Sequence, residues 1–378
     1  MEKPTNVKFA SGPCAKHFGW IAPSGKWSGR SHRSSDGLKF IQDIIKLQRK
    51  ILKIPDDYYL GIIGASSTGA MEALLWSLLG NLGIDVIAHC VFSYHWLNDI
   101  VNELKITDTR TISEVFPKIS DVSQVNFDRD VVFCISSTTS GVSFRDLNWI
   151  PDNRKGLTIC DAASAIFTMD FDWTKLDAVA FSWQKGIGGE AGQGSIVLSP
   201  RAISRLESYE PSRPIPRIFR IARAKKVNFN LFKGYTINTP SMICLEDFHD
   251  NLIWADNQGG LEALVRKVEQ NYSVLKEWVD GQENFCFLVG EKYRAHHIVC
   301  LDITCSVYQS MSDEGKWNCL KKIVAICEKE NVGFDFLGHI FTKPHLRIWA
   351  GPTIDHQDLK KLLPWIEFAY DKVAAECF

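Results

Sequence analysis

Short runs of almost wholly apolar residues recur in the first part of the chain, and stretches with frequent polar residues separate them. The apolar runs are 61–65, 85–92, 131–135, 157–160, 178–182 and 195–198. A strand that is buried on both faces has no polar side, so each run predicts a strand within a sheet. Residues 40–52 and 71–79 instead carry apolar residues at helical spacing. Such alternation of strands with helices predicts a mostly parallel sheet covered on both faces.

The pattern changes after about residue 250, where we expect a smaller α+β unit. The elements expected in this part are helices at 260–279, 316–330 and 358–374 and strands at 297–304 and 346–350. The start of the chain is irregular and rich in Gly, Ser and Pro. The division that follows is an N-terminal segment (1–35), a large domain (36–250) and a small C-terminal domain (251–378).

The composition is that of a globular protein without a strong net charge. The 378 residues are 45% hydrophobic and 23% charged, and 43 Lys and Arg stand against 44 Asp and Glu. This balance creates no field that attracts nucleic acid or an acidic membrane, so neither is an expected partner. The N-terminus shows no apolar signal sequence, and no apolar run is long enough to span a membrane, which favours a cytoplasmic location.

The chain has 11 cysteines, an odd number. None form a C-x-x-C pair, and no group of Cys and His has the spacing of a zinc site, so no metal is expected. Several cysteines lie inside apolar runs, for example Cys134 and Cys160. We expect these to be small buried hydrophobic residues in a reducing compartment.

Lys185 and Asp161 are the residues that most strongly suggest a chemistry. Lys185 follows the apolar run 178–182 in a glycine-rich stretch, and Asp161 follows the run 157–160. A carboxylate at the end of one strand and a lysine just past a nearby strand can flank one pyridine ring. Pyridoxal 5′-phosphate (PLP) needs a lysine that holds it as a Schiff base and an acid that keeps its ring nitrogen protonated. An ordinary exposed lysine would give the same local pattern.

Other polar or aromatic residues follow the remaining apolar runs. Ser67 and Thr68 lie between a strand and a helix, where hydroxyl groups can bind a phosphate but more often only cap the helix. Trp96 could stack on a flat cofactor or pack in the core. Thr138 lies beyond the run 131–135, at the end of the strand where ligands of α/β proteins bind.

Further candidates are less specific. Arg347 lies inside an apolar strand, where its guanidinium needs a partner such as a substrate carboxylate or an acidic side chain of the protein. Arg33, beside His32, could bind a carboxylate or phosphate or simply be exposed. Asn238 and Thr239 belong to a polar turn beside an apolar stretch.

Several motifs along the chain share one order and spacing with a known family. They lie at residues 9–14, 29–33, 65–70, 137–142, 161–164, 181–192, 236–242 and 346–351. Together these segments resemble phosphoserine aminotransferase, in class V of the fold-type I PLP enzymes, and most closely its alphaproteobacterial subgroup. The resemblance runs nearly from end to end. It implies an α/β fold with a mostly parallel seven-stranded sheet in a large domain and a smaller C-terminal α+β domain.

The resemblance also implies site residues. Lys185 would hold PLP and move the Cα proton, and Asp161 would pair with the ring nitrogen. The other implied cofactor contacts are Trp96 stacked on the ring, Thr138 at its phenolic oxygen, and Ser67, Thr68 and Gln184 at the phosphate with Asn238 and Thr239 of a second subunit. The residues implied at the substrate are Ser11, His32, Arg33 and Arg347, with Arg347 on the α-carboxylate. Because two chains build each site in this family, a homodimer is implied.

The sequence departs from the family pattern in two places. Other branches carry a glycine-rich turn with an arginine at the cofactor phosphate, and here the turn is Ser66-Ser67-Thr68. Other branches have a His-Arg pair before the C-terminal substrate arginine, whereas here Ile340 follows His339. The residues that would bind the substrate phosphate therefore match the family pattern less closely than those of the cofactor site. The cations that could bind this phosphate instead are Lys343, Arg217 and Arg220.

The activity implied by the resemblance is transamination between O-phospho-L-serine and 2-oxoglutarate, giving 3-phosphooxypyruvate and L-glutamate, in serine biosynthesis. A class V aminotransferase that uses serine or alanine with glyoxylate is the alternative, and it needs no second phosphate site. A catalytically silent PLP-binding protein and a cysteine desulfurase are further alternatives, the latter with Cys14 as its mobile cysteine. Participation in vitamin B6 synthesis stays open.

Overall fold

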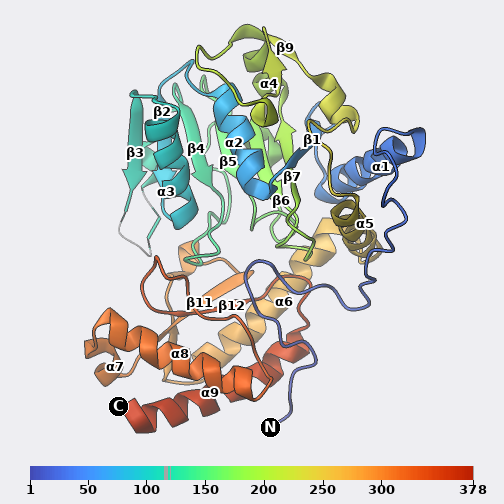
Figure 1. The fold of residues 1–378 in the computed structure, drawn as a ribbon. Helices are drawn as coiled ribbons and strands as arrows, with labels where there is room; N and C mark the ends of the chain where they lie inside the picture. The colour runs from blue at the N-terminus through green and yellow to red at the C-terminus, as the bar shows by residue number, and fades with distance from the viewer. Residues whose placement is uncertain (115–117, 120, 378) are drawn as a thin grey trace.

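The computed structural model describes residues 1–114, 118–119 and 121–377. They form a large α/β unit and a smaller α+β unit, one above the other in Figure 1. The large unit contains a seven-stranded sheet with the order β1-β7-β6-β5-β4-β2-β3. Its strands are β1 (Tyr59–Gly64), β2 (Ile84–Ala88), β3 (Thr109–Ser113), β4 (Asp130–Cys134), β5 (Thr158–Asp161), β6 (Ala178–Ser182) and β7 (Gln193–Leu198).

Most neighbouring strands of this sheet are parallel, as predicted. Strand β7 runs antiparallel to both β1 and β6, and the pairs β2–β3, β2–β4, β4–β5 and β5–β6 are parallel. The carboxyl ends of the parallel strands therefore meet at one edge, and this edge faces the small unit (Figure 1). Polar loops that follow these strands are thereby brought together.

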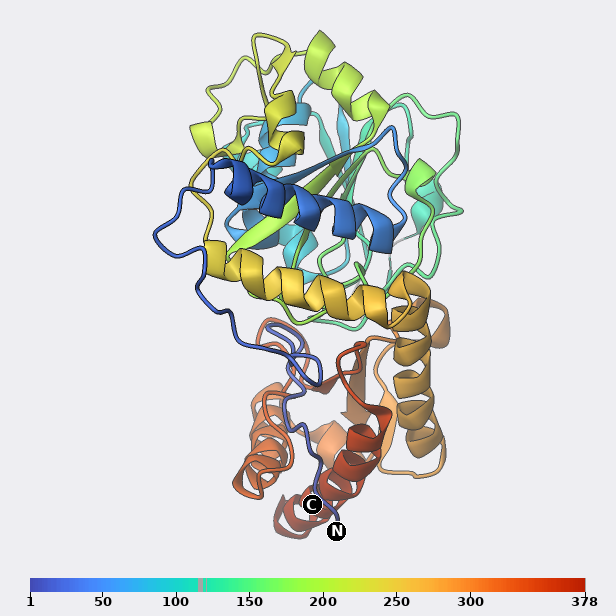
Figure 2. The same ribbon diagram turned by 90° about the vertical axis from the view of Figure 1, so that its right-hand side faces the viewer.

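Helices cover both faces of the large sheet. On one face lie α1 (Ser35–Leu52) and α5 (Met242–Asn257), which Figure 2 shows in front of the strands. On the other lie α2 (Ser66–Leu78), α3 (Val91–Asn98) and α4 (Pro200–Ser208). Each face has its own hydrophobic core, because the alternate residues of the strands point to opposite sides. The short hairpin β8 (Ala222–Arg223) and β9 (Lys226–Val227) follows α4.

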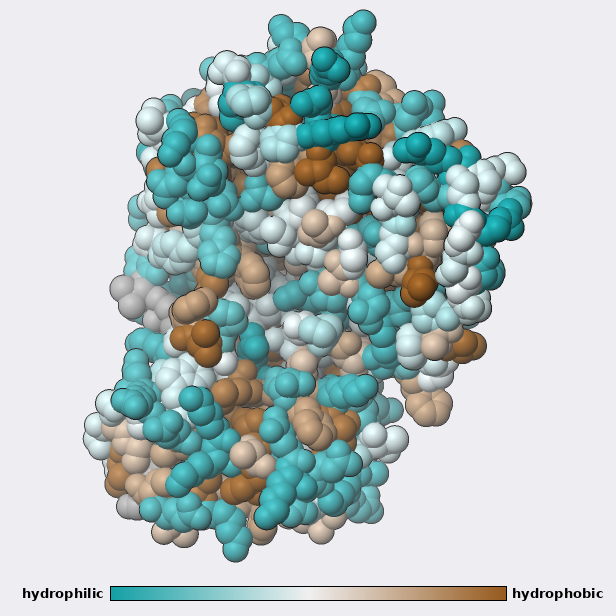
Figure 3. Space-filling model, in the orientation of Figure 1, coloured by the Kyte–Doolittle hydropathy of each residue, from teal (hydrophilic) through white to brown (hydrophobic). Residues whose placement is uncertain are grey.

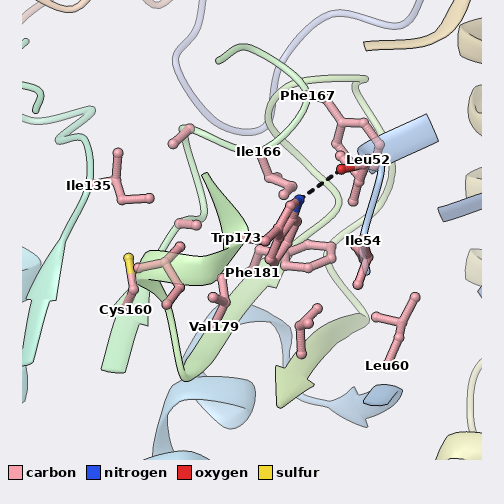
Figure 4. Packing of buried hydrophobic residues seen from close by; sticks show 14 of the residues in the cluster. Leu52, Ile54, Leu60, Ile135, Cys160, Ile166, Phe167, Trp173, Val179 and Phe181 are labelled. Carbon is pink, nitrogen blue, oxygen red and sulfur yellow. Dashed lines mark hydrogen bonds between the residues drawn. The ribbon is translucent and has the colours of Figure 1, made fainter. Parts of the chain in front are cut away.

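Packing on the α1 and α5 face anchors the strand that leads to Lys185. Figure 4 shows Trp173, Phe181 and Leu52 packed together, with the Trp173 indole N–H donating to the Leu52 carbonyl oxygen at 2.9 Å. Phe181 belongs to β6 and is fully buried. A close-packed neighbourhood leaves strand β6 little freedom, so the loop directly after it starts from a fixed position.

The small unit is built on a three-stranded antiparallel sheet with the order β10-β11-β12. Its elements are α6 (Gly260–Asp280), β10 (Phe285–Phe287), β11 (Ile298–Ile303), α7 (Ser306–Ser310), α8 (Asp313–Lys329), β12 (Leu346–Trp349) and α9 (His356–Cys377). These elements share a third hydrophobic core, which also takes in Phe9 from the N-terminal segment. Backbone hydrogen bonds from Phe334 N to Val7 O and from Trp349 N to Phe9 O attach this segment to the small unit.

Two details of the expected element pattern are wrong. The run 85–92 was expected to be one strand, but β2 ends at Ala88 and α3 begins at Val91. Val91 and Phe92 are apolar because they lie in a partly buried helix, and Cys90 caps that helix by accepting from Ser93 N. Strand β3 was not predicted, because it is an edge strand whose side chains are largely exposed.

The expected boundary between residues 250 and 251 falls inside α5, a helix that packs on α1 and the large sheet. The three-part division of the chain stays a prediction. Figure 3 shows polar side chains over much of one face, with hydrophobic ones scattered among them. Among the helices of the described residues, none combines the length and the apolar character needed to cross a bilayer.

Candidate active site

The loops at the carboxyl edge of the sheet bring Lys185, Asp161 and Thr138 together. Asp161 is the last residue of β5 and lies opposite Cys134 of β4 and Ala180 of β6 in the strand register. Lys185 follows the end of β6, and its Nζ donates a hydrogen bond to Thr138 Oγ1 at 2.7 Å. The predicted meeting of a lysine and a carboxylate beyond neighbouring strands is therefore observed.

Lys185 is buried, and its surroundings disfavour the charged form of its amine. Burial lowers the pKa of Lys185, and the nearby Arg347 lowers it further, while Cys14 and Asp161 act in the opposite direction. The Nζ also lies 5.6 Å from the centroid of the Phe92 ring. A lysine with a lowered pKa has more of the neutral amine that can attack a carbonyl or take a proton.

Asp161 is held by two donors. The Ala163 backbone N–H donates to Oδ1 at 3.0 Å, and the Trp96 indole N–H donates to Oδ2 at 3.1 Å. Burial raises the pKa of the Asp161 carboxyl to about 6, while these two donors favour the carboxylate. A buried carboxylate of this kind is strongly stabilised by a cationic group placed against it, such as a protonated ring nitrogen.

Two aromatic residues of α3, Trp96 and Phe92, lie beside this cluster. Trp96 is buried with its N–H on Asp161, and its stacking on the cofactor ring stays a prediction. Phe92, one turn earlier in α3, is the ring that lies over Lys185 Nζ. Phe92 was missed because its run was assigned to a strand, whereas a helix that starts at Val91 turns it toward the lysine.

The start of α2 is an open helix end with a strained backbone. Ala65 and Ser66 have φ angles of 66° and 59°, in the left-handed region that non-glycine residues rarely adopt. No side chain caps the helix at Ala65, and Ser67 and Thr68 are not buried. Free N–H groups at a helix N-terminus bind anions, and backbone strain is common where ligands bind. Ser66 O lies beside Gly194, so this end adjoins the strands that lead to Lys185.

Arg347 brings the small unit into the site. Its Nη1 donates to the Thr138 carbonyl oxygen at 2.7 Å, and its Nε is buried with no hydrogen-bond partner among the described residues. His339 lies in the same electrostatic neighbourhood, because burial and the charges of Arg347, His95 and Lys185 all lower its pKa. Arg347, His339 and Lys185 are thus close enough to influence one another electrostatically, and their roles at the substrate stay predictions.

Residues 11–20 of the N-terminal segment line one side of the site and are called the N-terminal wall below. A Cβ added to Gly12 would lie 3.2 Å from Lys185 Cε, and the Cys14 N–H donates to the Gln184 carbonyl oxygen at 2.8 Å. Ser11 is buried beside them. Burial raises the pKa of the Cys14 thiol, which keeps it protonated. A buried and protonated thiol does not suit the mobile nucleophile of a desulfurase.

Four of the predicted site residues do not join this cluster within one chain. His32 and Arg33 lie at the start of α1, and no hydrogen bond or ion pair in the described part of the chain connects them to Lys185, Asp161 or Arg347. Asn238 lies against Gly64, where a Cβ on the glycine would be 3.1 Å from the Asn238 amide nitrogen. Thr239 is exposed next to it.

A cleft of about 580 Å³ lies between the two units beside this cluster. His89 and Tyr94 line it from the large unit, and Lys343 lines it from the small unit. Of the cations suggested to assist at the substrate phosphate, Lys343 thus faces the cleft. Arg217 begins the short 3₁₀ helix Arg217–Phe219, which packs against α2, and Arg220 is the C-cap of this helix. Sequence reasoning did not select His89, which is buried and has no hydrogen-bond partner for either ring nitrogen within the described residues.

The residues present fit a PLP molecule. Within the described residues, Ser182 Oγ and Gln184 Oε1 are buried without a hydrogen-bond partner, and Gln184 adjoins Lys185. Buried polar atoms without partners are rare and indicate a missing ligand or water. An amine, a carboxylate, an aromatic ring and an open helix end correspond to the aldehyde, ring nitrogen, ring face and phosphate of this cofactor.

Comparison with known proteins gives a consistent picture. No protein-family model matches the chain. The chain is 44% identical over 373 residues to a phosphoserine aminotransferase of Methanosarcina barkeri, covering 98% of each sequence. A structure of PLP-bound phosphoserine aminotransferase from Trichomonas vaginalis matches with a TM-score of 0.79 and 15% identity, covering 95% of this chain and 99% of that one. An alanine–glyoxylate aminotransferase from Nostoc matches with a TM-score of 0.77 and 15% identity, covering 98% and 96%.

Proposed function

This chain belongs to the phosphoserine aminotransferase family, and from that membership we propose that it transfers an amino group between O-phospho-L-serine and 2-oxoglutarate. The products are 3-phosphooxypyruvate and L-glutamate, and the reaction serves serine biosynthesis. PLP is the cofactor. The observation that carries the chemistry is the buried Lys185 with a lowered pKa, hydrogen-bonded to Thr138 and close to Asp161.

When bound, PLP supplies an aldehyde that condenses with amines and a pyridinium ring that draws electrons from the substrate Cα. Lys185 Nζ would hold the aldehyde carbon, and Thr138 would bind the phenolic oxygen. The open start of α2, with Ser67 and Thr68, would bind the phosphate. Gln184 would add a hydrogen bond there by donating from its side-chain amide Nε2.

Lys185 also carries the proton in this proposal. Once the substrate amine has displaced it, Nζ would be free to take the proton from the substrate Cα and pass it to the cofactor carbon that keeps the amino group, and the second half-reaction would move a proton in the reverse direction. This role needs a neutral amine, and burial together with the charge of Arg347 lowers the pKa of Lys185 in that direction. Thr138 Oγ1 accepts from Nζ and orients it.

Asp161 keeps the ring nitrogen protonated. Its carboxylate is fixed by donors on both oxygens, one from Ala163 and one from Trp96. In a buried site the opposite charges of a carboxylate and a pyridinium stabilise each other strongly. Phe92 would supply the aromatic contact to the ring face that sequence reasoning gave to Trp96.

Arg347 binds the α-carboxylate of the substrate, because its guanidinium reaches Thr138 and retains an unpaired Nε among the described residues. Ser11 lies next to Gly12 on the N-terminal wall and would face the substrate from there. The substrate phosphate is bound by His32 and Arg33, with His339 and Lys343 at the cleft. Burial and the charges of Arg347, His95 and Lys185 lower the pKa of His339, which favours its neutral form as a hydrogen-bond donor.

A homodimer with shared sites accounts for the residues that lie apart within one chain. His32, Arg33, Asn238 and Thr239 are outside the Lys185 cluster, and Arg33, Asn238 and Thr239 are exposed. A second copy that presents them to the first would complete both sites by symmetry. The enzyme is proposed to act in the cytoplasm, and a second role in vitamin B6 synthesis stays open.

The serine- or alanine–glyoxylate aminotransferases are the second candidate, since the Nostoc enzyme of that kind shares the fold. The test is a transamination assay of the PLP-loaded protein, with O-phospho-L-serine and 2-oxoglutarate compared with L-serine or L-alanine and glyoxylate. We expect kcat/KM for O-phospho-L-serine to exceed that for serine by about 10⁴-fold, because a site built to bind a polar group rejects analogues that lack it. Lys185→Ala is the inactive control. Preference for glyoxylate would overturn the proposal.

A further inference from the structure

Asp247 is a buried carboxylate outside the site that collects donors from three parts of the chain. It lies in α5 and has 1% of its surface exposed. Lys16 Nζ and the Trp20 indole N–H donate to its Oδ1 at 2.7 and 2.9 Å. The Glu190 backbone N–H donates to its Oδ2 at 2.8 Å, and Asn251 Nδ2 lies 3.3 Å from the same oxygen. Nothing in the reaction proposed above uses this residue.

These contacts join two segments that lie next to Lys185 in the fold. Lys16 and Trp20 belong to the N-terminal wall, and Glu190 belongs to the glycine-rich loop that follows Lys185. Figure 2 shows the N-terminal segment rising from the small unit past α5 to the start of α1. Lys16 Nζ also pairs with the Glu190 carboxylate at 3.0 Å. Asp247 therefore holds the wall and the loop against one helix.

A few residues and contacts link the partners of Asp247 to the Lys185 side chain. From Lys16 the chain leads back to Cys14, whose N–H bonds to Gln184 O, and to Gly12, which lies against the Lys185 side chain. On the other side, a Cβ on Gly188 would lie 2.3 Å from Ala15 O, so the loop and the wall are in close contact. A displacement of the wall would move Ser11 and Gly12 relative to Lys185.

The charge of Asp247 matters as well as its position. Both oxygens receive N–H donors, and one donor is the ammonium of Lys16. An asparagine would turn an NH₂ group toward one set of these donors and would leave buried N–H groups without an acceptor. Loss of the acceptor would remove the bonds of Lys16 and Trp20 to α5, leaving His17 bonded to Asp250 of the same helix, and it would alter no group that touches the cofactor or the substrate.

We propose that Asp247 is a positioning residue for the transamination, which sets the place of Ser11 and Gly12 over Lys185 by binding the N-terminal wall and the 186–190 loop to α5. The inference rests on the proposed function for the role of Ser11 at the substrate. Its geometric part, the attachment of the wall, can be tested without turnover.

The experiment compares Asp247→Asn with Asp85→Asn in the PLP-loaded protein. Asp85 is also fully buried and also accepts several donors, from Arg110, Arg129 and the Asn126 N–H, but it lies at the opposite edge of the sheet. For Asp247→Asn we expect KM for O-phospho-L-serine to rise about tenfold, because small displacements of binding groups are costly. PLP affinity, measured by fluorescence titration, should change less than about twofold, since Asp247 touches no cofactor group. Asp85→Asn should lower Tm with KM unchanged.

Amide hydrogen exchange separates this inference from the proposed function. Asp247→Asn should speed exchange over residues 11–20, including the Cys14 amide, and Asp85→Asn should not. Faster exchange together with an unchanged KM would overturn the positioning role. Equal exchange in the two variants would overturn the attachment itself. If the wild-type protein lacks activity with O-phospho-L-serine, the proposed function fails and the exchange result still decides the attachment.

Trp20→Phe provides a milder variant in case Asp247→Asn does not fold. It keeps a six-membered aromatic ring at the position and removes the pyrrole part of the indole, with the N–H that donates to Asp247 Oδ1. We expect a smaller rise in KM, about threefold, with PLP affinity retained. A Trp20→Phe protein with wild-type KM and wild-type exchange over residues 11–20 would contradict the proposal.

Discussion

Burial determines the charge of the two residues at the centre of the site. It lowers the pKa of Lys185 and raises that of Asp161 to about 6, so both groups are moved toward their neutral forms. The hydrogen bonds differ, because Lys185 meets a hydroxyl acceptor whereas Asp161 meets two N–H donors. The donors favour the carboxylate, and this allows Asp161 to support a protonated ring nitrogen at neutral pH.

The roles of Trp96 and Phe92 can be separated by substitution. Trp96→Phe keeps a ring but removes the N–H that donates to Asp161, so the pKa of Asp161 should rise. Protonation of Asp161 removes the charge that pairs with the ring nitrogen, and PLP binding weakens as the pH falls. In the variant this weakening should begin at a higher pH than in the wild type. At pH 8 its PLP affinity should stay within about threefold of the wild type. Phe92→Ala should weaken PLP binding about tenfold at every pH, because it removes the aromatic contact.

Fluorescence titration of the apoprotein with PLP from pH 5.5 to 8.5 measures both effects. Unchanged PLP affinity in Phe92→Ala would contradict the aromatic contact assigned to Phe92, and the stacking prediction for Trp96 would then stand.

His297 makes the free energy of unfolding depend on pH. It is buried, its Nε2 lies 2.9 Å from Ser136 Oγ, and burial lowers its pKa to about 3. As the pH falls below about 6.5, the unfolded chain binds a proton that folded His297 does not bind, so stability decreases with falling pH. From pH 6.5 to 5 this group alone should lower the free energy of unfolding by roughly 2 kcal/mol.

His297→Gln keeps a hydrogen-bonding side chain and removes this titration. Urea unfolding of the apoprotein at pH 7 and pH 5 should therefore show a smaller decrease for the variant than for the wild type. The same decrease in both proteins would show that His297 does not stay neutral in the folded state. The difference between the two proteins is the quantity to use, because burial also lowers the pKa of His345 to about 4.

At the scale of elements, the start of α2 combines local strain with an open helix end. Two successive residues, Ala65 and Ser66, adopt positive φ angles without being glycine. Each such residue costs roughly 1 kcal/mol relative to a relaxed backbone. This start of the helix lies at the carboxyl edge of the sheet, next to β7, the strand that follows the Lys185 loop.

Glycine at position 65 should relieve that strain. We expect Ala65→Gly to raise the free energy of unfolding of the apoprotein by about 0.5–1 kcal/mol, because glycine adopts a positive φ without a steric penalty. The matched control is Ala70→Gly in the interior of the same helix, which should lower it by about 1 kcal/mol. Denaturant unfolding measures both, and destabilisation of similar size at the two positions would contradict the left-handed conformation of Ala65.

The strands that could be predicted from sequence are those whose side chains are all buried among apolar residues. Strand β6 was located to the residue, because each of its side chains is buried. The exposed edge strand β3 has no continuous apolar run. The end of β2 could not be located, because the apolar residues at the start of α3 extend its run. In the site, Lys185 and Asp161 were found because residues just past parallel strands must meet. Phe92 was missed because its run was assigned to a strand, and Asp247 was missed because its partners are far away in sequence.

At the scale of the whole molecule, the site is made of parts that are separate in the chain. The large unit provides Lys185 and Asp161, the small unit provides Arg347, and the first residues of the chain pass between them. The first residues also enter the core of the small unit through Phe9. A change in how the two units meet would therefore alter the wall over Lys185 and the position of Arg347 together.

The proposed homodimer predicts complementation between two inactive variants. Lys185→Ala removes the cofactor attachment, and Arg33→Ala removes the phosphate contact that a second copy is proposed to provide. A mixed dimer of the two would contain one site with Lys185 and Arg33 both intact, so a 1:1 mixture formed by co-expression should recover about a quarter of wild-type activity. Activity of the mixture no higher than that of the two variants alone would show that Arg33 serves its own chain.

The most direct test of the central claim, that Lys185 carries PLP in a site specific for a phosphorylated amino acid, is the visible spectrum of the purified protein. The spectrum is recorded during titration with O-phospho-L-serine and, separately, with L-serine. The account predicts an absorption band of the lysine-linked cofactor that is absent in Lys185→Ala and disappears on addition of O-phospho-L-serine but not of serine. An equal response to serine would contradict the phosphate specificity, and a protein with no band even after addition of PLP would contradict the role of Lys185.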